Sequence, residues 1–183
     1  MLNETLRKVA ATLDELHVPY ALIGGLAVAA RGAFRTTKDV DLLIDHPLHE
    51  GPSLTRSLNE HGLPATFHKG AADDPVSGVI RVVVPTAVGE IKCDVLFPSK
   101  LWQAEAVRRA TRVDMGGFIV PVVPAADLFL LKLHAGGTMD LFDAARLLEL
   151  QTAEERRAWE KRAAEIHRSR AYARCLKFLR EGL

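Results

Sequence analysis

Residues 20–45 decide the fold, and they read YALIGGLAVAARGAFRTTKDVDLLID. A short apolar run stops at Gly24 and Gly25, and a second apolar run carries Asp39 and Asp41 at its start. The brevity and branched side chains of residues 40–44 predict a strand. Alternate side chains of a strand share a face, so the two carboxylates would lie about 6–7 Å apart, where ionised acids repel each other and are costly to bury.

A bound divalent cation would remove both penalties. Mg²⁺ takes carboxylate oxygens and usually keeps waters and substrate phosphates as its remaining ligands. A plainer interpretation is also open, in which the strand enters the core from a polar loop. Asp39 would then cap the turn, and Asp41 would be solvated at an edge of the sheet.

Asp94 and the glycine pair favour the interpretation that a divalent cation binds here. Gly24 and Gly25 precede a short Ala-rich segment, and glycines at a helix start let the backbone approach an anion closely, although such a pair is also common in plain turns. Asp94 lies within the apolar run of residues 91–97, which follows residues 79–84 as the second arm of a predicted hairpin. If that arm lies beside the strand of Asp39 and Asp41, three carboxylates converge.

The loop between the glycines and the aspartates is rich in groups that bind phosphate. Arg35, Thr37 and Lys38 supply cations and a hydroxyl where a polyphosphate would lie. Asp45 would share the face of the two aspartates, but it lies about 13 Å beyond Asp41 at strand rise, so we leave it out of the site.

The sequence pattern along the whole chain predicts a mixed α/β body followed by helices. It has 183 residues, 48% of them hydrophobic, and a net charge of +1, as expected for a globular protein. We place the boundary after residue 121, with a catalytic domain at 1–121 and a helical part at 122–183. The two cysteines lie far apart, and we find neither a signal-peptide core nor a membrane span, so we expect a cytoplasmic protein without disulfides.

The acids and glycines together resemble the nucleotidyltransferase superfamily of DNA polymerase β. Its pattern is an apolar residue and two small residues, a spacer, then Asp-apolar-Asp, with a third acid on a later strand. Here Ile23-Gly24-Gly25 is followed by thirteen residues and Asp39-Val40-Asp41-Leu42, with Asp94 as the third acid. The resemblance implies a nucleotidyltransferase fold, a mixed, twisted β-sheet flanked by helices with a C-terminal helical part.

Within that superfamily, IGGLAVAARGAFRTTKDVDLL most resembles the AbiEii-like toxins of the MenT type. The likeness extends to a lysine and an Asp-x-x-Asp in the helical part, here Lys132, Asp140 and Asp143. It implies that Lys132 reaches the triphosphate. The plainer alternative is a lysine whose stem covers apolar surface, and Asp140 and Asp143 more simply fix helix packing or pair with an arginine.

The resemblance implies transfer of a nucleoside monophosphate from an NTP to an acceptor hydroxyl, with two Mg²⁺ ions as cofactors. Asp39 and Asp41 would bind Mg²⁺, while Asp94 would bind a second ion or take the hydroxyl proton. Charge on the triphosphate would be neutralised by the phosphate-binding set of Gly24, Gly25, Arg35, Thr37, Lys38 and Lys132.

The toxin resemblance makes RNA, in particular a tRNA 3′ end, the expected acceptor, and a cognate antitoxin a possible partner. From residue 151 on, nine basic residues face five acidic ones, and this basic tail either meets RNA phosphates or is a solvated helix face. Two alternatives stay open. The chain could modify a small molecule such as an aminoglycoside or a lincosamide, or it could be a non-catalytic antitoxin or regulator with the same fold.

Overall fold

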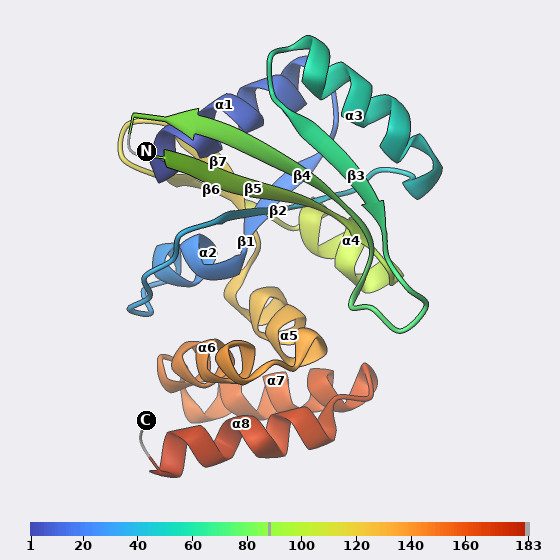
Figure 1. Ribbon diagram of the computed structural model, residues 1–183. Coiled ribbons are helices and arrows are strands. Elements are labelled where there is room, and N and C mark those ends of the chain that lie inside the picture. Colours follow the sequence, from blue (N-terminus) through green and yellow to red (C-terminus); the bar gives the residue numbers. More distant parts are fainter. Residues whose placement is uncertain (88, 182–183) are drawn as a thin grey trace.

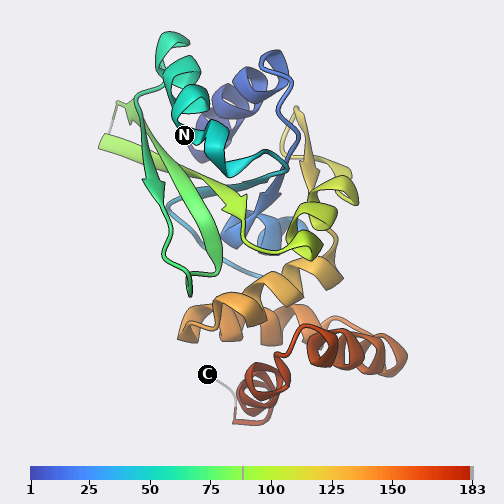
Figure 2. The same ribbon diagram turned by 90° about the vertical axis from the view of Figure 1, so that its right-hand side faces the viewer.

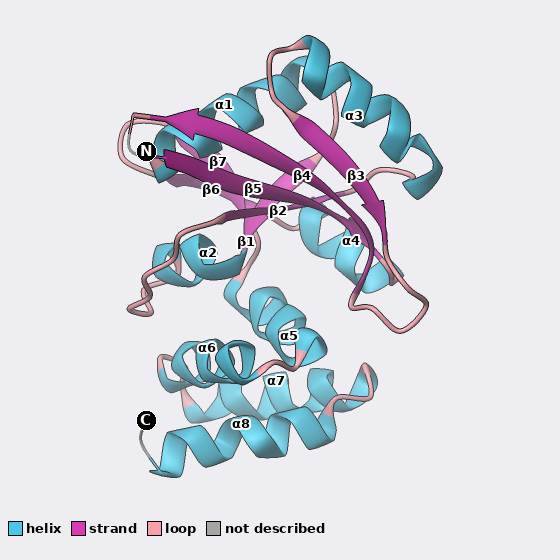
Figure 3. Cartoon of the chain, in the orientation of Figure 1, coloured by secondary structure: helices cyan, strands magenta, loops and turns pink. Residues whose placement is uncertain are grey.

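The computed structural model describes residues 1–87 and 89–181, which form one mixed sheet and a set of helices (Figures 1 and 3). The seven strands are β1 (Tyr20–Ile23), β2 (Val40–Ile44), β3 (Ala65–Lys69), β4 (Val76–Thr86), β5 (Gly89–Pro98), β6 (Thr111–Asp114) and β7 (Ile119–Val122). Their order across the sheet is β3-β4-β5-β2-β1-β7-β6. The predicted fold class is therefore confirmed.

Within the residues that the structure describes, eight α-helices and one short 3₁₀ turn at Leu48–Glu50 accompany the strands. The helices are α1 (Leu2–Glu15), α2 (Gly24–Ala30), α3 (Gly51–Glu60), α4 (Leu101–Arg108), α5 (Ala125–Ala135), α6 (Thr138–Glu149), α7 (Ala153–Glu165) and α8 (Ser169–Glu181). Both ribbon views show α1 and α3 at one end of the molecule and α5–α8 at the other, with α5 and α6 nearer the sheet (Figures 1 and 2).

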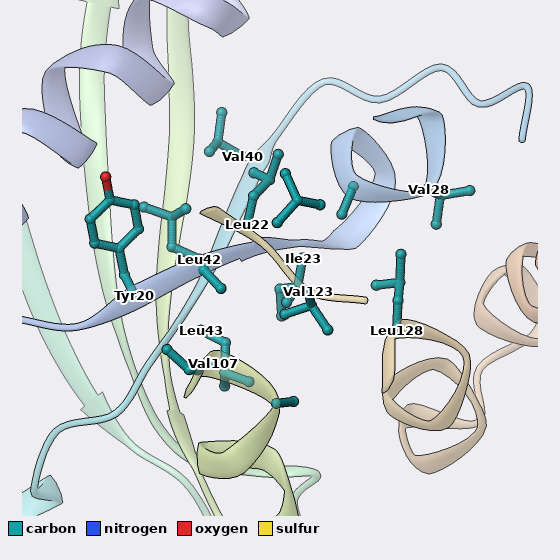
Figure 4. Close-up of a cluster of buried hydrophobic side chains, with 14 of the residues drawn as sticks. Tyr20, Leu22, Ile23, Val28, Val40, Leu42, Leu43, Val107, Val123 and Leu128 are labelled. Carbon is teal, nitrogen blue, oxygen red and sulfur yellow. The ribbon is translucent and has the colours of Figure 1, made fainter. Parts of the chain in front are cut away.

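The centre of the sheet is β2, the strand of the two aspartates. It pairs antiparallel with β1 and parallel with β5. Val40, Leu42 and Leu43 have no exposed surface, and they pack among apolar side chains of the neighbouring elements (Figure 4). Burial of these side chains anchors β2, so the acid at its start is held by a rigid element.

The helical part is tied to the rest of the fold through α5. Phe129 packs against Trp159 of α7 and Tyr172 of α8, with ring centroids 5.1 and 6.1 Å away. Asp127, whose side chain is 3% exposed, forms ion pairs with Arg109, which follows α4, and Arg162 of α7. The division of the chain into two domains at residue 121 stays a prediction.

Two local features of the fold are not evident from the sequence. Strand β6 lacks an apolar pattern, because Thr111–Asp114 are mostly polar and exposed. Helix α4 begins at Leu101, after Lys100 as its N-cap. The Gln103 side chain accepts hydrogen bonds from the backbone N–H groups of Ser99 and Lys100 at 2.7 and 2.9 Å. No helix within residues 1–87 and 89–181 combines the length and apolar character needed to cross a membrane.

Candidate active site

Two of the predicted acids lie side by side on the sheet. The parallel pairing of β2 with β5 sets Asp41 opposite Asp94. Adjacent strands lie about 4.8 Å apart, and register partners point to the same face, so the two side chains are neighbours. Asp39 directly precedes β2 and is exposed. Of the three carboxylates expected to converge, the fold thus brings Asp41 and Asp94 together as neighbours on adjacent strands.

The carboxyl of Asp41 has a raised pKa. Burial raises the pKa of its carboxyl to about 6, and the charges of Asp94, Asp39 and Asp140 push it in the same direction. The ammonium group of Lys132 opposes the shift without cancelling it. The site thus holds more negative charge than its own cations balance, which is the condition that a bound dication relieves.

Asp94 is already engaged by a residue that the sequence analysis did not single out. Arg81 of β4 stands opposite it, donating from Nε to Oδ1 at 2.9 Å and from Nη2 to Oδ2 at 2.8 Å. This is the side-on, bidentate geometry in which guanidinium groups bind carboxylates most strongly. Both oxygens of the third acid are therefore in contact with an arginine.

The glycine pair gives the backbone room beside the acids. Gly24 has a φ of +67°, and a Cβ placed there would lie 1.9 Å from Oδ2 of Asp41. A Cβ on Gly25 would lie 2.8 Å from Cβ of Thr37. Glycine at position 24 is thus required twice, by the left-handed backbone and by the close approach of the carboxylate.

A pocket of about 210 Å³ opens beside Asp41, between the sheet and the helical part. Gly24, Asp41 and Lys132 line its polar side, while Leu96, Leu128 and Leu131 contribute an apolar wall. A second hollow of about 480 Å³ is lined by the loop of residues 35–39. Of the predicted phosphate-binding residues, Gly24 and Lys132 thus line the pocket, and Arg35, Thr37 and Lys38 line the second hollow.

Lys132 lies at this cleft in an ion-pair network. Its Nζ is 3.0 Å from Asp140 Oδ1 and 2.9 Å from Asp143 Oδ2, and its side chain is 12% exposed. Burial lowers the pKa of Lys132, but Asp140 and Asp143 outweigh it, so the net shift is upward and the lysine stays charged.

Asp143 joins Lys132 to the loop. Its side chain is 1% exposed, and its Oδ1 lies 3.0 Å from Nε of Arg35. At that distance the two charges attract, although the groups are not aligned as in a good hydrogen bond. Asp143 is therefore the arginine partner that the sequence suggested. Lys38 and Thr37 follow Arg35 in the loop, Lys38 exposed and Thr37 half-buried.

The donor set fits a hard divalent cation. Asp39, Asp41 and Asp94 offer only carboxylate oxygens, the ligands that Mg²⁺ prefers, and Gly24 leaves space at Asp41 that any side chain would fill. Within residues 1–87 and 89–181, no three His, Cys, Asp or Glu side chains are yet gathered closely enough to hold a metal ion. Both oxygens of Asp94 accept hydrogen bonds from Arg81 of β4.

Comparison with solved structures supports the fold. An antigenic nucleotidyltransferase-like protein from Paracoccidioides brasiliensis matches with a TM-score of 0.54 and 18% identity, over 94% of this chain and 91% of that one. The antibiotic-resistance factor ANT(2'')-Ia matches in its solution structure with a TM-score of 0.56 and 15% identity, over 94% and 100% of the two chains.

A crystal structure of ANT(2'')-Ia in complex with adenylyl-2''-tobramycin matches with a TM-score of 0.55 and 15% identity, over 93% of this chain and 97% of that one. None of the curated proteins compared with the sequence matches it. At these identities the structural likeness concerns the fold alone.

The family is shown by a sequence model that spans nearly the whole chain. Residues 9–182 match the family described as nucleotidyl transferase AbiEii toxin of type IV toxin–antitoxin systems. The match agrees with the resemblance carried by the glycines and aspartates, and with a fold shared with nucleotidyltransferase-like proteins. The chain therefore belongs to the AbiEii family and is a nucleotidyl-transferring enzyme.

Proposed function

We propose that this enzyme is a Mg²⁺-dependent toxin that transfers a nucleoside monophosphate from an NTP to the 3′ hydroxyl of an RNA, in particular a tRNA. The observation that carries the proposal is the pairing of Asp41 with Asp94 on neighbouring strands, with Asp41 at a cleft that Gly24 and Lys132 also line. The AbiEii family adds the toxin context.

Asp39 and Asp41 would hold the first Mg²⁺ ion, and Asp94 would hold a second ion or take the proton of the attacking hydroxyl. When bound, the metal would supply positive charge that stabilises the attacking acceptor oxygen and the leaving pyrophosphate oxygen. The raised pKa of Asp41, about 6, favours this assignment, because such a buried carboxylate is stabilised in its charged form by a cation.

The chain's own cations would bind the triphosphate. Lys132 and Arg35 are held at the cleft by the buried Asp143, so both present their charge from fixed positions. Gly24 and Gly25 let the backbone approach the phosphates, and Thr37 and Lys38 add a hydroxyl and a cation from the loop. Such preorganised charges stabilise the phosphates without reorganisation during the reaction.

In the reaction, the acceptor oxygen forms a bond to the α-phosphorus while the bond from that phosphorus to the bridging oxygen breaks. The products are a nucleotidylated acceptor and pyrophosphate. The hydroxyl proton leaves to Asp94 or, where Asp94 holds an ion, to solvent. The place of action is the cytoplasm, where nucleoside triphosphates and tRNA occur together.

The acceptor assignment has support from the helical part. The sequence of α8 from residue 169 to 180 contains no acid, and Arg170, Arg174 and Lys177 are exposed at helical spacing on one side. Such a row of cations suits a phosphate backbone. The affinity for RNA should then fall steeply as the salt concentration rises from about 50 to about 200 mM. An affinity that does not change over this range would argue against RNA as the acceptor.

The direct test is incubation with each labelled NTP, Mg²⁺ and total cellular RNA. Labelled RNA that disappears in the Asp41→Asn and Asp94→Asn variants supports the proposal. Label on an aminoglycoside instead would favour the small-molecule alternative, which the fold shared with ANT(2'')-Ia makes worth including. Tight binding to a neighbouring gene's protein without any transfer would favour the non-catalytic alternative, whereas a protein that suppresses active transfer would be the cognate antitoxin.

A further inference from the structure

Arg81 has no part in the proposed reaction, yet it contacts one of the proposed metal ligands through both carboxylate oxygens. The sheet aligns three charged residues in one row, Arg81 on β4, Asp94 on β5 and Asp41 on β2. The side chain of Arg81 is 44% exposed and that of Asp94 is 21% exposed. The arginine is therefore the more solvent-exposed partner of this ion pair.

A guanidinium group and a divalent cation compete for the same carboxylate. Arg81 occupies Oδ1 and Oδ2 of Asp94 at 2.9 and 2.8 Å, so an ion could use only the remaining lone pairs. The hydrogen bonds and charge of Asp94, together with the charge of Asp39, raise the pKa of Arg81, so it stays cationic and repels a nearby dication.

We propose that Arg81 is a positioning residue that holds Asp94 away from the metal until a triphosphate arrives. Phosphate oxygens match the guanidinium fork as well as a carboxylate does, so an incoming triphosphate can take the place of Asp94. The released carboxylate then joins Asp39 and Asp41. This inference rests on the proposed function, and it makes the third acid available only when substrate is present.

The inference predicts two effects of opposite sign in Arg81→Gln. Without nucleotide, Mn²⁺ as the probe ion should bind about thirtyfold more tightly than to the wild type. Loss of one positive charge about 6 Å from a dication gives about tenfold of this even in water-like surroundings, and the freed Asp94 carboxylate gives about threefold more. Without metal, in the presence of a chelator, inorganic triphosphate should bind severalfold more weakly, because a phosphate contact is lost. Arg81→Lys keeps the charge but not the fork, and it should bind Mn²⁺ only about threefold more tightly.

The measurements are a Mn²⁺ titration followed by the electron paramagnetic resonance of the free ion, and calorimetry with triphosphate, both on the full chain. Arg108→Gln is the matched control, because it breaks another exposed arginine–aspartate pair, with Asp45 at 2.7 Å, outside the site. Arg108→Gln should leave both affinities unchanged. The tightening caused by Arg81→Gln should also shrink in an Asp94→Asn background, as a double-mutant cycle would measure.

Equal tightening with and without Asp94 would overturn the inference, because Arg81 would then act as a distant charge only. So would unchanged Mn²⁺ affinity in both Arg81 variants while Asp41→Asn loses the ion, an outcome that leaves the proposed function intact. Equal and negligible Mn²⁺ binding by the wild type, Arg81→Gln and Asp41→Asn would instead remove the metal site, and with it both proposals.

Discussion

Replacing Asp41 with asparagine should stabilise the metal-free enzyme while removing its function. The wild-type carboxylate lies in a buried position among other acids, and its pKa is raised from 3.8 to about 6. Asparagine has nearly the same shape but cannot ionise. The substitution therefore removes the cost of a buried charge and also removes the proposed metal ligand.

The magnitude follows from the shift in pKa. A difference of about two units between the folded and unfolded states corresponds to about 3 kcal/mol of unfolding free energy. For a chain of this size, that amount raises the melting temperature by roughly 6–12 °C.

The sign also fixes the pH window. The folded state binds the extra proton, so the wild type loses this stability as pH rises from about 4 to about 6 and lacks all of it above pH 7. The advantage of Asp41→Asn should accordingly be near zero at pH 4, grow through that window and be complete at pH 8.

Urea unfolding in a chelating buffer at pH 5 and pH 8 measures this advantage directly. Asp73→Asn is a suitable control, because Asp73 is exposed and the substitution should change neither value. A second series with Mg²⁺ and an NTP should stabilise the wild type and leave Asp41→Asn unchanged. The reasoning is refuted if Asp41→Asn is no more stable than the wild type at pH 8, or if its advantage is the same at both pH values.

Three more variants test other parts of the site. Asp94→Asn should lower transfer of labelled nucleotide to RNA by at least about 100-fold with a melting temperature within a few degrees of the wild type, and transfer at wild-type rate would contradict its role. Gly24→Ala should lose Mn²⁺ binding in the same titration, because its Cβ would lie 1.9 Å from Asp41 Oδ2, whereas Gly62→Ala, at φ +74° with open space around it, should keep it. Lys132→Met should lower the unfolding free energy by about 3–5 kcal/mol in urea, because Asp41, Asp140 and Asp143 lose their shared counter-charge, and a neutral result would show that the network adds no stability.

The adjacency of the acids could be predicted only in part from the sequence. The spacing of Asp39 and Asp41 indicates a shared face because strand periodicity is two, and that inference needs no tertiary information. The position of Asp94 depends on whether β5 lies beside β2, and the register partners Asp41 and Asp94 are 53 positions apart in the sequence (94 − 41 = 53). Only the family resemblance joined the two segments before the fold was known.

The ion pairs of the site are harder to predict from the sequence, because each depends on the burial of its side chains, which the sequence does not reveal. Asp143 lies one helical turn from Asp140, and nothing in MDLFD indicates that the side chain of Asp143 is 1% exposed while that of Asp140 is 30% exposed. The packing of α6 under α5 and the loop decides that difference. It turns Asp143 into the common partner of Arg35 and Lys132, two residues that the sequence placed separately on the triphosphate.

The contact of Arg81 with Asp94 follows from the register of the β4–β5 hairpin, which the position of its turn determines. Thr86 pairs with Gly89 at the end of the β4–β5 hairpin, and stepping back equally along both strands from that pair sets Arg81 opposite Asp94. The turn that fixes this register lacks the Asn-Gly or Asp-Gly pair that marks such turns in a sequence. A shift of one residue would have moved the arginine to the other face of the sheet and left the third carboxylate unpaired. The proposed control of metal binding therefore depends on the register of a single hairpin.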